Sequence, residues 1–556
     1  HVTGVQTCAL PILNMKKLIA AALAFLMLAL TFAGCSNSDE SIDMIYPFGG
    51  NINSFDPQVA STEDEFLITE NCFEGLVRCD DEGNITPGCA QNWEVSSDGK
   101  TYTFQLYQGL KWHIYDSVAE KMGENYSPEI TADDFVFALQ RAADDLTQSP
   151  LYSTISSIAN APEVHSGRAD ESTLGVTASG KYTLTIHLSS PDESFLETMS
   201  TAVAMPCNRE FFEATAGRYG LDLEYTMFNG QFYITNVLDT SYILAANKEY
   251  AGPTKPKATD LTLNIAEEGT DLSEDLLSGY YDAAYIRGYE SSGISENSGI
   301  TMTPYSNITW MLVINGNEGL FSAKDARRAL YLSMADMDYE EFPYLQKATG
   351  YVPPTCTANG AQYNTAVPAV TESADAAKAE ELWRKVISDQ EIYTAEITLL
   401  VPDYMEDAAR QLVQGIQAGI GAVSSVDEKD VDFTMVIETL PESELKSRVA
   451  AYDYDIALYP YEASSTSPVT FLQTFANVSY AYIDTAGYND VLADAASADA
   501  ADLADACREC EAELYQNYSF LPVFYESCYY AEAKGVSGVQ FHPGSGRVSF
   551  INATRT

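Results

Sequence analysis

Residues 396–458 contain EITLLV (396–401), DAARQLVQGIQAGI (407–420), FTMVI (433–437), SELKSRVA (443–450) and DIAL (455–458). We predict strands over the first, third and fifth of these segments and helices over the second and fourth. Strands that alternate with helices in this way favour a mostly parallel sheet covered by helices. The sequence therefore predicts an α/β fold.

Further strands and helices are expected on either side of this region. The stretch TYTFQL (101–106) alternates apolar and polar residues, and Asp98-Gly99 before it predicts a hairpin turn. Thr131 and Ser322 each stand three residues before an aspartate, which predicts helix N-caps, and Gly75 is expected to end a helix. The other expected strands are 42–48, 93–95, 182–188, 228–234, 242–247 and 309–315, and the helices are 65–76, 133–143, 322–334 and 374–387.

The composition bounds the function before any motif is considered. The 556 residues allow roughly three domains of about 150 residues each. The chain is 46% apolar and 20% charged, which excludes a disordered or collagen-like chain. It has 80 acidic and 30 basic residues and a net charge of −50, so nucleic acid is not expected as a partner and peripheral binding to anionic lipids is disfavoured. Acidity alone does not name a ligand.

A secretory signal is expected near the N-terminus. Met15-Lys16-Lys17 is basic, and the apolar run that follows to Ala33 is about 16 residues long, shorter than the roughly 20 that a membrane span needs. Thr31-Phe32-Ala33-Gly34-Cys35 resembles a bacterial lipobox. We therefore expect residues 15–34 to be a lipoprotein signal peptide and Cys35 to be the lipidation site.

Two short segments flank this signal. Residues 1–14 precede a good Met start and are expected to be an artefactual extension, and residues 35–41 are polar and are expected to be a tether. No other stretch is apolar enough to span a bilayer. We expect the body of the protein to be extracytoplasmic and lipid-anchored to the bacterial cell membrane, on its periplasmic or cell-surface side.

Motifs for catalysis are absent from the sequence. It has no HExxH, no paired histidine ligands, no GxSxG, no P-loop and no GxGxxG fingerprint. Carboxylates are so abundant that their proximity in the sequence says nothing about a glycosidase pair. We expect no enzyme activity, no cofactor and no metal site.

Eight cysteines remain once Cys8 in the suspected extension and Cys35 are set aside. An exported protein can oxidise its thiols, but an even count gives no connectivity. Cys507 and Cys510 share one helical stripe with leucines, Leu514 among them, which favours packing in the core. A disulfide elsewhere and a metal site are the alternatives for this pair.

Short motifs occur in a fixed order along the chain. They are Phe55-Asp56-Pro57, Asn71-Cys72-Phe73-Glu74-Gly75-Leu76-Val77, Trp93 to Phe104, Thr131 to Val136, Asn229-Gly230, Phe321 to Leu330, Tyr454-Asp455-Ile456-Ala457 and Leu521-Pro522-Val523. In this order they resemble the extracellular solute-binding proteins of family 5, the oligopeptide- and dipeptide-binding lipoproteins of ATP-driven (ABC) importers. The resemblance covers essentially all of residues 42–550.

The resemblance implies a periplasmic-binding-protein-like type II fold, an α/β architecture of two lobes joined by a hinge, with an inserted third domain. Carried over by the motif positions, lobe I is 42–74, 196–307 and 529–556, the inserted domain is 75–195 and lobe II is 308–528. Ligand is expected between the lobes, which close around it. The implied partners are a short peptide or related small solute and the ABC permease subunits, and we expect a monomer.

The resemblance also implies a ligand-binding set. Peptide-binding relatives hold the ligand backbone between a segment after the Asp-Pro turn, here 60–64, and one after the Tyr-Asp-Ile-Ala strand, here 459–464. The aspartate that usually pairs with the ligand α-ammonium corresponds to Ser464, so Glu462 or Glu63 is expected to supply that carboxylate. The expected ligand-binding residues are Thr62, Glu63, Trp310, Tyr459, Tyr461, Glu462, Ser464 and Tyr525.

Several alternatives stay open at this point. Tyr461 and Glu462 also suit lobe packing or a solvated rim, and Trp310 and Tyr525 also suit the core. Because Ser464 departs from the family pattern, the same scaffold could bind a sugar, an opine or a metal chelate instead of a peptide. A peptide sensor and an extracellular hydrolase are the remaining hypotheses. Import of short peptides is the leading one.

Overall fold

The computed structural model describes residues 42–80, 82–124, 126–192, 194–267, 269–317, 319–334, 337–463, 465–479, 481, 485–542 and 547–556. The expected signal, tether and lipidation site Cys35 lie outside the described residues, and so does Ser464. Residues 42–556 form one compact unit. Among the described residues no helix is both long and apolar enough to cross a membrane.

The larger sheet has seven strands in the order β11-β21-β12-β20-β16-β19, with β13 beside β21. Only β16 pairs in parallel, with β19 and β20, whereas every other pair of this sheet is antiparallel. The prediction of a mostly parallel sheet is therefore wrong, because long strands far apart in sequence pair directly here. The strands are β11 (Ala283–Ile286), β12 (Thr301–Ile314), β13 (Leu345–Lys347), β16 (Thr394–Pro402), β19 (Asp432–Leu440), β20 (Ile456–Glu462) and β21 (Phe520–Glu532).

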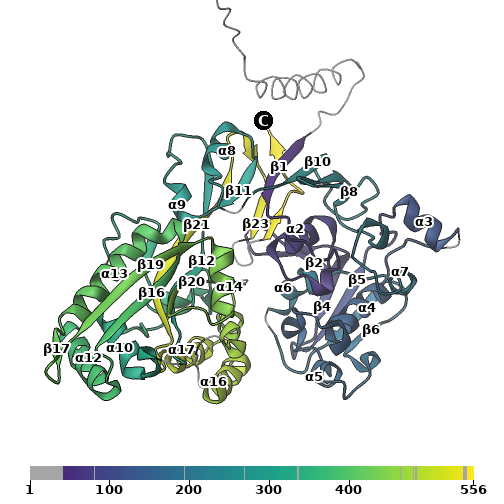
Figure 1. Cartoon of the computed structure of the whole chain (residues 1–556). Coiled ribbons are helices and arrows are strands. Elements are labelled where there is room, and N and C mark those ends of the chain that lie inside the picture. Colours follow the sequence, from purple (N-terminus) through teal and green to yellow (C-terminus); the bar gives the residue numbers. More distant parts are fainter. Residues whose placement is uncertain are drawn as a thin grey trace, which may run out of the picture. The chain divides into compact units, whose positions relative to one another are not determined.

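The five segments between residues 396 and 458 form the predicted elements. α13 (Glu406–Gly421) joins β16 to β19, and α14 (Glu442–Ala450) joins β19 to β20. The connection from β16 to β19 and the connection from β19 to β20 run in opposite directions along the sheet. Parallel crossovers are almost always right-handed, so α13 and α14 are expected on opposite faces, and Figure 1 shows them on opposite sides of the sheet. The other helices of this half are α9 (Gly288–Ser291), α10 (Lys324–Ser333), α11 (Tyr363–Ala366), α12 (Ala376–Gln390), α15 (Pro468–Gln473), α16 (Thr485–Ser497) and α17 (Leu503–Tyr515).

Two four-stranded sheets form the rest of the unit. The first has the order β1-β10-β9-β8 and the second, wholly antiparallel, has the order β4-β5-β7-β6. Their strands are β1 (Asp43–Phe48), β8 (Phe232–Leu238), β9 (Ser241–Ala246), β10 (Asp260–Ile265), β4 (Ala90–Val95), β5 (Thr101–Leu106), β6 (Val176–Ala178) and β7 (Thr183–His187). The predicted turn between β4 and β5 is confirmed, with Gly99 in the left-handed region at φ +68°.

Short helices and hairpins complete this half. The helices are α2 (Glu63–Cys72), α3 (Asp116–Met122), α4 (Ala132–Ala143), α5 (Ala161–His165), α6 (Phe195–Thr198), α7 (Arg209–Ala214) and α8 (Ser273–Ser278). The two-stranded pairs of this half are β2 (Val77–Cys79) with β3 (Ile85–Pro87), β22 (Val536–Ser537) with β25 (Thr554–Arg555), and β23 (Gln540–His542) with β24 (Arg547–Ser549). Two further pairs, β14 (Thr357–Ala358) with β15 (Ala361–Gln362) and β17 (Ser425–Val426) with β18 (Lys429–Asp430), belong to the half with the larger sheet.

One of the three predicted helix ends is confirmed. Thr131 caps α4 in a capping box with Asp134. Ser322 is not a cap, because α10 begins after Ala323 and the Ser322 hydroxyl donates to the carbonyl of Gly319 at 2.7 Å. Gly75 does not end a helix either, since α2 stops at Cys72. A glycine is needed at position 75 because a Cβ there would lie 2.9 Å from the carbonyl oxygen of Met199.

Two hydrophobic cores divide this unit. One contains the buried residues of the two four-stranded sheets and of β11. The other contains the buried residues of the larger sheet and its helices from Ile308 to Cys528. Along β12 the change falls between Tyr305 and Ile308, where the register with β21 also shifts. Tyr285 packs against both cores. We call them the N-terminal core and the C-terminal core.

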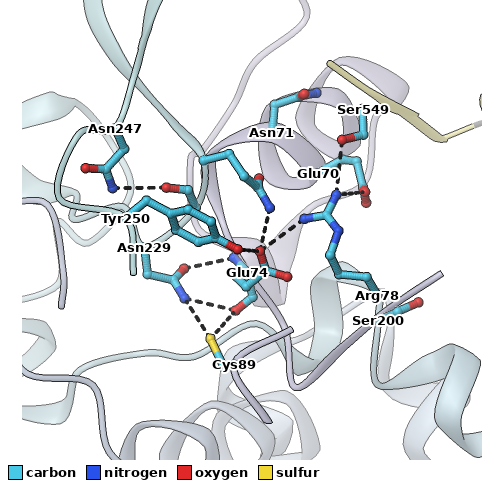
Figure 2. Close-up of polar contacts among 12 residues, drawn as sticks. Glu70, Asn71, Glu74, Arg78, Cys89, Ser200, Asn229, Asn247, Tyr250 and Ser549 are labelled. Atoms are coloured by element: carbon cyan, nitrogen blue, oxygen red, sulfur yellow. Dashed lines mark hydrogen bonds and ion pairs between the residues drawn. The ribbon is translucent and has the colours of Figure 1, made fainter. Parts of the chain in front are cut away.

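A buried polar network holds α2 against the segment that precedes β8 (Figure 2). The Asn229 amide donates to the carbonyl of Glu74 at 2.9 Å, and the backbone N–H of Glu74 donates to the Asn229 side chain at 3.0 Å. The Glu74 carboxylate accepts hydrogen bonds from Arg78, Gln231 and Tyr250. These contacts connect the motif at residues 71–77 with the motif at Asn229-Gly230, which are about 150 residues apart in the sequence. We call this network the structural joint.

Gly230 is part of this joint and gives a direct test of it. A Cβ at position 230 would lie 2.4 Å from the backbone carbon of Cys72 and 2.5 Å from the nitrogen of Phe73. We expect Gly230→Ala to destabilise the protein by about 3 kcal/mol, because the backbone of the neighbouring segment must move. Gly421→Ala is the control, since a Cβ there meets nothing within 4 Å. Thermal unfolding compares the two, and an equal effect would contradict the account of the joint.

Candidate ligand-binding site

Glu63 is the first residue of α2, and a capping box fixes its position. The backbone N–H of Glu65 donates to the Thr62 hydroxyl at 3.1 Å, and the Glu65 carboxylate accepts the backbone N–H of Thr62 at 3.1 Å. The Thr62 hydroxyl donates to the carbonyl of Asn51 at 2.8 Å. The Thr62 side chain is thus committed to the helix start, whereas Glu63 is exposed to solvent.

Glu462 ends β20 on the side of the C-terminal core. It lies opposite Ile308 of β12, and Ile308 in turn lies opposite Glu526 of β21. Residues directly opposite each other on antiparallel strands share a face of the sheet, so Glu462 and Glu526 project from the same face. Glu462 is half-buried and Glu526 is fully buried.

The carboxylates of Glu63 and Glu462 interact although their elements pack on different cores. The pKa of Glu63 is raised to about 7, first by the negative charge of Glu462, then by reduced hydration and by Asp64. Lys446 and Arg287 act in the opposite direction, but their effect is smaller.

Arg287 is held by Glu526 and not by this pair. Its guanidinium donates to the two oxygens of Glu526 at 3.1 and 2.9 Å, and the indole N–H of Trp310 and the backbone N–H of Gly288 donate to the same carboxylate at 2.8 and 3.0 Å. Burial raises the pKa of Glu526, but Arg287 and the other donors outweigh it and hold that pKa below its ordinary value. The result is a buried, fully hydrogen-bonded ion pair.

Lys446 is likewise paired with a different carboxylate. Its ammonium lies 2.6 Å from Glu442 one turn earlier on α14, and the hydroxyl of Tyr404 donates to the same carboxylate. Arg287 approaches Glu442 at 3.6 Å. Burial opposes the charge of Glu442, yet these neighbours lower its pKa. Both cations that act on Glu63 thus have carboxylate partners of their own.

The predicted aromatic residues lie deeper than Glu63 and Glu462. Tyr461 is buried, and its ring centroid lies 4.9 Å from that of Phe475 and 5.0 Å from that of Tyr459. Tyr459 is half-buried. Trp310 is fully buried and its N–H is bonded to Glu526.

Tyr525 is also buried in this structure. Its hydroxyl accepts the backbone N–H groups of Gly350 at 3.0 Å and Thr349 at 3.3 Å. Within the predicted set, the residues that reach solvent among those described are Thr62, Glu63, Tyr459 and Glu462. The roles of all eight residues in ligand binding stay predictions.

Sequence reasoning missed the charged residues around the acidic pair. Glu442 and Lys446 lie on α14, Glu526 lies on β21 and Arg287 lies between β11 and α9, and no motif links them. Only the spacing of Glu442 and Lys446 is a recognisable signal of an ion pair, since Lys446 lies on the predicted helix 443–450 and Glu442 immediately precedes it. The contacts of Arg287 arise from strand register, which the sequence does not display.

The described residues contain no group of three or more His, Cys, Asp or Glu side chains arranged to hold a metal ion. All eight described cysteines are free, and Cys507 and Cys510 are fully buried on α17. Burial raises the pKa of each of these two thiols to about 12, so both are neutral. Their burial agrees with the prediction that both thiols pack in the core as small apolar groups.

Comparison with protein families decides the class of this chain. The model of the bacterial extracellular solute-binding proteins, family 5 Middle, matches residues 84–482, which is most of the chain. The chain belongs to this family. Its members are extracytoplasmic solute-binding proteins and not enzymes.

Individual relatives agree with this assignment. The dipeptide-binding protein of Lactococcus lactis subsp. cremoris is 21% identical over 95% of this chain and 98% of its own length. The oligopeptide-binding protein AmiA of Streptococcus pneumoniae is 30% identical over 50% of this chain. That alignment covers 42% of AmiA, so the chain matches less than half of this relative.

A solved structure shows the fold. The substrate-binding domain of an oligopeptide ABC transporter from Bacillus anthracis superposes with a TM-score of 0.73 at 22% identity, covering 93% of this chain and 100% of that structure. The predicted fold class is thereby confirmed as the two-lobed periplasmic-binding-protein type with an inserted domain.

Proposed function

We propose that this chain is the peptide-binding subunit of an ATP-driven importer. It captures a short peptide outside the cytoplasmic membrane, is tethered there by lipid on Cys35, and delivers the peptide to membrane permease subunits as a monomer. Family membership supports the solute-binding role, and the expected signal at residues 15–34 supports export.

The proposed movement is closure of two lobes around the peptide. Lobe I is 42–74, 196–307 and 529–556, with residues 75–195 inserted, and lobe II is 308–528. Two observations support this division: the hydrophobic core changes along β12 between Tyr305 and Ile308, and the strand register shifts at the same place. A ligand that touches both lobes stabilises the closed form.

The observation that carries the proposal is the acidic pair. Glu63 and Glu462 come from different lobes, and the neighbouring cations Arg287 and Lys446 are bonded to other carboxylates. A ligand ammonium placed between Glu63 and Glu462 would relieve their repulsion and join the two lobes. We assign the α-ammonium to Glu462, two residues from the family position at Ser464. Thr62, Trp310, Tyr459, Tyr461, Ser464 and Tyr525 complete the proposed set.

Thermal unfolding of the leaderless protein with di- to hexapeptides tests this function. A peptide at about 100 times its dissociation constant is expected to stabilise the folded state by roughly 2.7 kcal/mol and to raise Tm. N-terminal acetylation of the same peptide should abolish the rise, because the amide carries no charge. If no peptide changes Tm in protein refolded free of bound ligand, the chain binds another class of solute.

A further inference from the structure

One short segment leaves the N-terminal core, contacts the C-terminal core and returns. Ile286 at the end of β11 is buried in the N-terminal core, and Ile294 packs against the same core. Between these two residues lie Arg287 and the helix α9. The strands β12 and β21 connect the two cores through the backbone, whereas this segment reaches the C-terminal core through noncovalent contacts. We call residues 287–291 the clasp.

The inner part of the clasp is fixed close to the place where β21 passes from one core to the other. The Arg287 guanidinium donates to both oxygens of Glu526, and the backbone N–H of Gly288 donates to the same carboxylate at 3.0 Å. A Cβ at position 288 would lie 2.5 Å from the Cβ of Tyr344, which packs against the C-terminal core. These buried, closely packed contacts leave the inner part of the clasp little freedom to move.

The outer part of the clasp contacts residues that lie on neither of the connecting strands. The ring of Tyr289 stacks on that of Tyr404, with centroids 4.8 Å apart and ring planes inclined by 19°. The Arg287 guanidinium lies 3.6 Å from the carboxylate of Glu442, the first residue of α14. Tyr289, Tyr404 and Glu442 are each half-buried. Water can replace contacts of this kind at small cost, so they can break and form again.

Glu290 anchors the clasp to the N-terminal core. Its carboxylate accepts the backbone N–H of Leu272 at 3.0 Å and that of Arg287 at 2.6 Å. Leu272 packs against the N-terminal core. The clasp is therefore attached to one core while its outer face touches the other. If the two cores rotate about β12 and β21, the distances across these outer contacts must change.

We propose that the clasp is a conformational device: the contacts of Tyr289 with Tyr404 and of Arg287 with Glu442 favour the arrangement of the two cores seen here and break when the lobes rotate. This inference rests on the proposed closure of two lobes and goes beyond peptide binding itself. A contact made in only one arrangement shifts the equilibrium between the two. The clasp thereby changes the apparent affinity for a peptide that it does not touch.

Small-angle X-ray scattering of the leaderless protein without peptide tests the clasp directly. Tyr289→Leu removes the ring stack, and Glu442→Gln removes the charge that attracts Arg287 while keeping the shape of the side chain. We expect the scattering profile of both variants to depart from that of the parent protein, because one arrangement is no longer favoured. Tyr280→Leu and Glu444→Gln are the matched controls at exposed positions, and neither should change the profile.

Calorimetric titration of the same proteins with tri-alanine measures the effect on binding. We expect the affinity to change by about threefold or more in both clasp variants, and by less than that in the controls. A scattering profile that moves toward that of the parent protein with peptide should accompany tighter binding, and a profile that moves away should accompany weaker binding.

Two results would overturn the inference and leave the proposed function standing. One is unchanged scattering and unchanged affinity in both Tyr289→Leu and Glu442→Gln. The other is an equal change in the two control variants. Absence of tri-alanine binding to the parent protein would count against the proposed function, while the scattering of the clasp variants would still decide the inference.

Discussion

Glu526→Gln is expected to destabilise the C-terminal core by about 3 kcal/mol, because it leaves the Arg287 guanidinium without its buried partner. The substitution keeps the shape of the side chain, so no cavity contributes to the loss. Glu526 is fully buried and receives two hydrogen bonds from Arg287 and one from Trp310. Chemical unfolding followed by circular dichroism at pH 7 measures the change in the free energy of unfolding.

The pH dependence of this loss identifies its cause. Because the pKa of Glu526 is lowered in the folded protein, its charge stabilises the fold above the ordinary carboxyl range, and this stabilisation is lost as the pH falls through the folded-state pKa. The difference between parent and variant should therefore shrink at low pH. Glu163→Gln is the control, since Glu163 and its partner Arg168 are exposed, and no measurable change is expected there. A pH-independent difference would contradict the ion-pair explanation.

Binding of tri-alanine, a short peptide with a free α-ammonium, is expected to weaken steeply in acid. The ligand ammonium binds the ionised form of Glu63, whose pKa is raised to about 7 by the charge of Glu462, by reduced hydration and by Asp64. Below that value a proton must leave before the ligand enters, so the affinity should fall roughly 50-fold between pH 7 and pH 5. Calorimetric titrations at several pH values, in buffers of different ionisation enthalpy, measure both the affinity and the proton release.

Glu63→Gln provides the matched comparison for this pH series. Without the titrating carboxyl, the affinity of the variant for tri-alanine should change by less than about threefold over the same range, since Glu462 then lacks its coupled neighbour. The cations Lys446 and Arg287 are common to both proteins and do not titrate in this range. A variant that retained the full pH dependence would show that another group, and not Glu63, takes up the proton.

Local sequence patterns predicted the strands and helices whose positions follow from the spacing of their own apolar residues. The alternation between residues 396 and 458 gave the strands and helices of the C-terminal core, because each element is defined by its own apolar residues. Thr131 caps its helix as predicted. Ser322 and Gly75 are residue types that commonly stand at helix ends, but α10 begins after Ala323 and α2 stops at Cys72, so neither ends a helix. The mixed strand directions depend on the pairing of β12 with β21, which lie more than 200 residues apart.

The candidate site shows the same limit. Glu462 was predicted because it stands two residues from the family aspartate position at Ser464, and Glu63 because it lies in the opposing segment. In the structure the charge of Glu462 raises the pKa of Glu63. Neither Arg287 nor Glu526 was predicted, since only strand register aligns Glu462, Ile308 and Glu526 in one row. Trp310 and Tyr525 are aromatic residues for which sequence could not distinguish core from ligand contact, and this structure buries both.

Selection from a mixture tests the central claim most directly. The leaderless protein is incubated with a proteolytic digest, half of it acetylated at the amino termini, and the retained peptides are identified by mass spectrometry. The account predicts retention of short peptides with a free α-ammonium and loss of the acetylated ones. Equal retention of acetylated and free peptides, or retention of none, would contradict it.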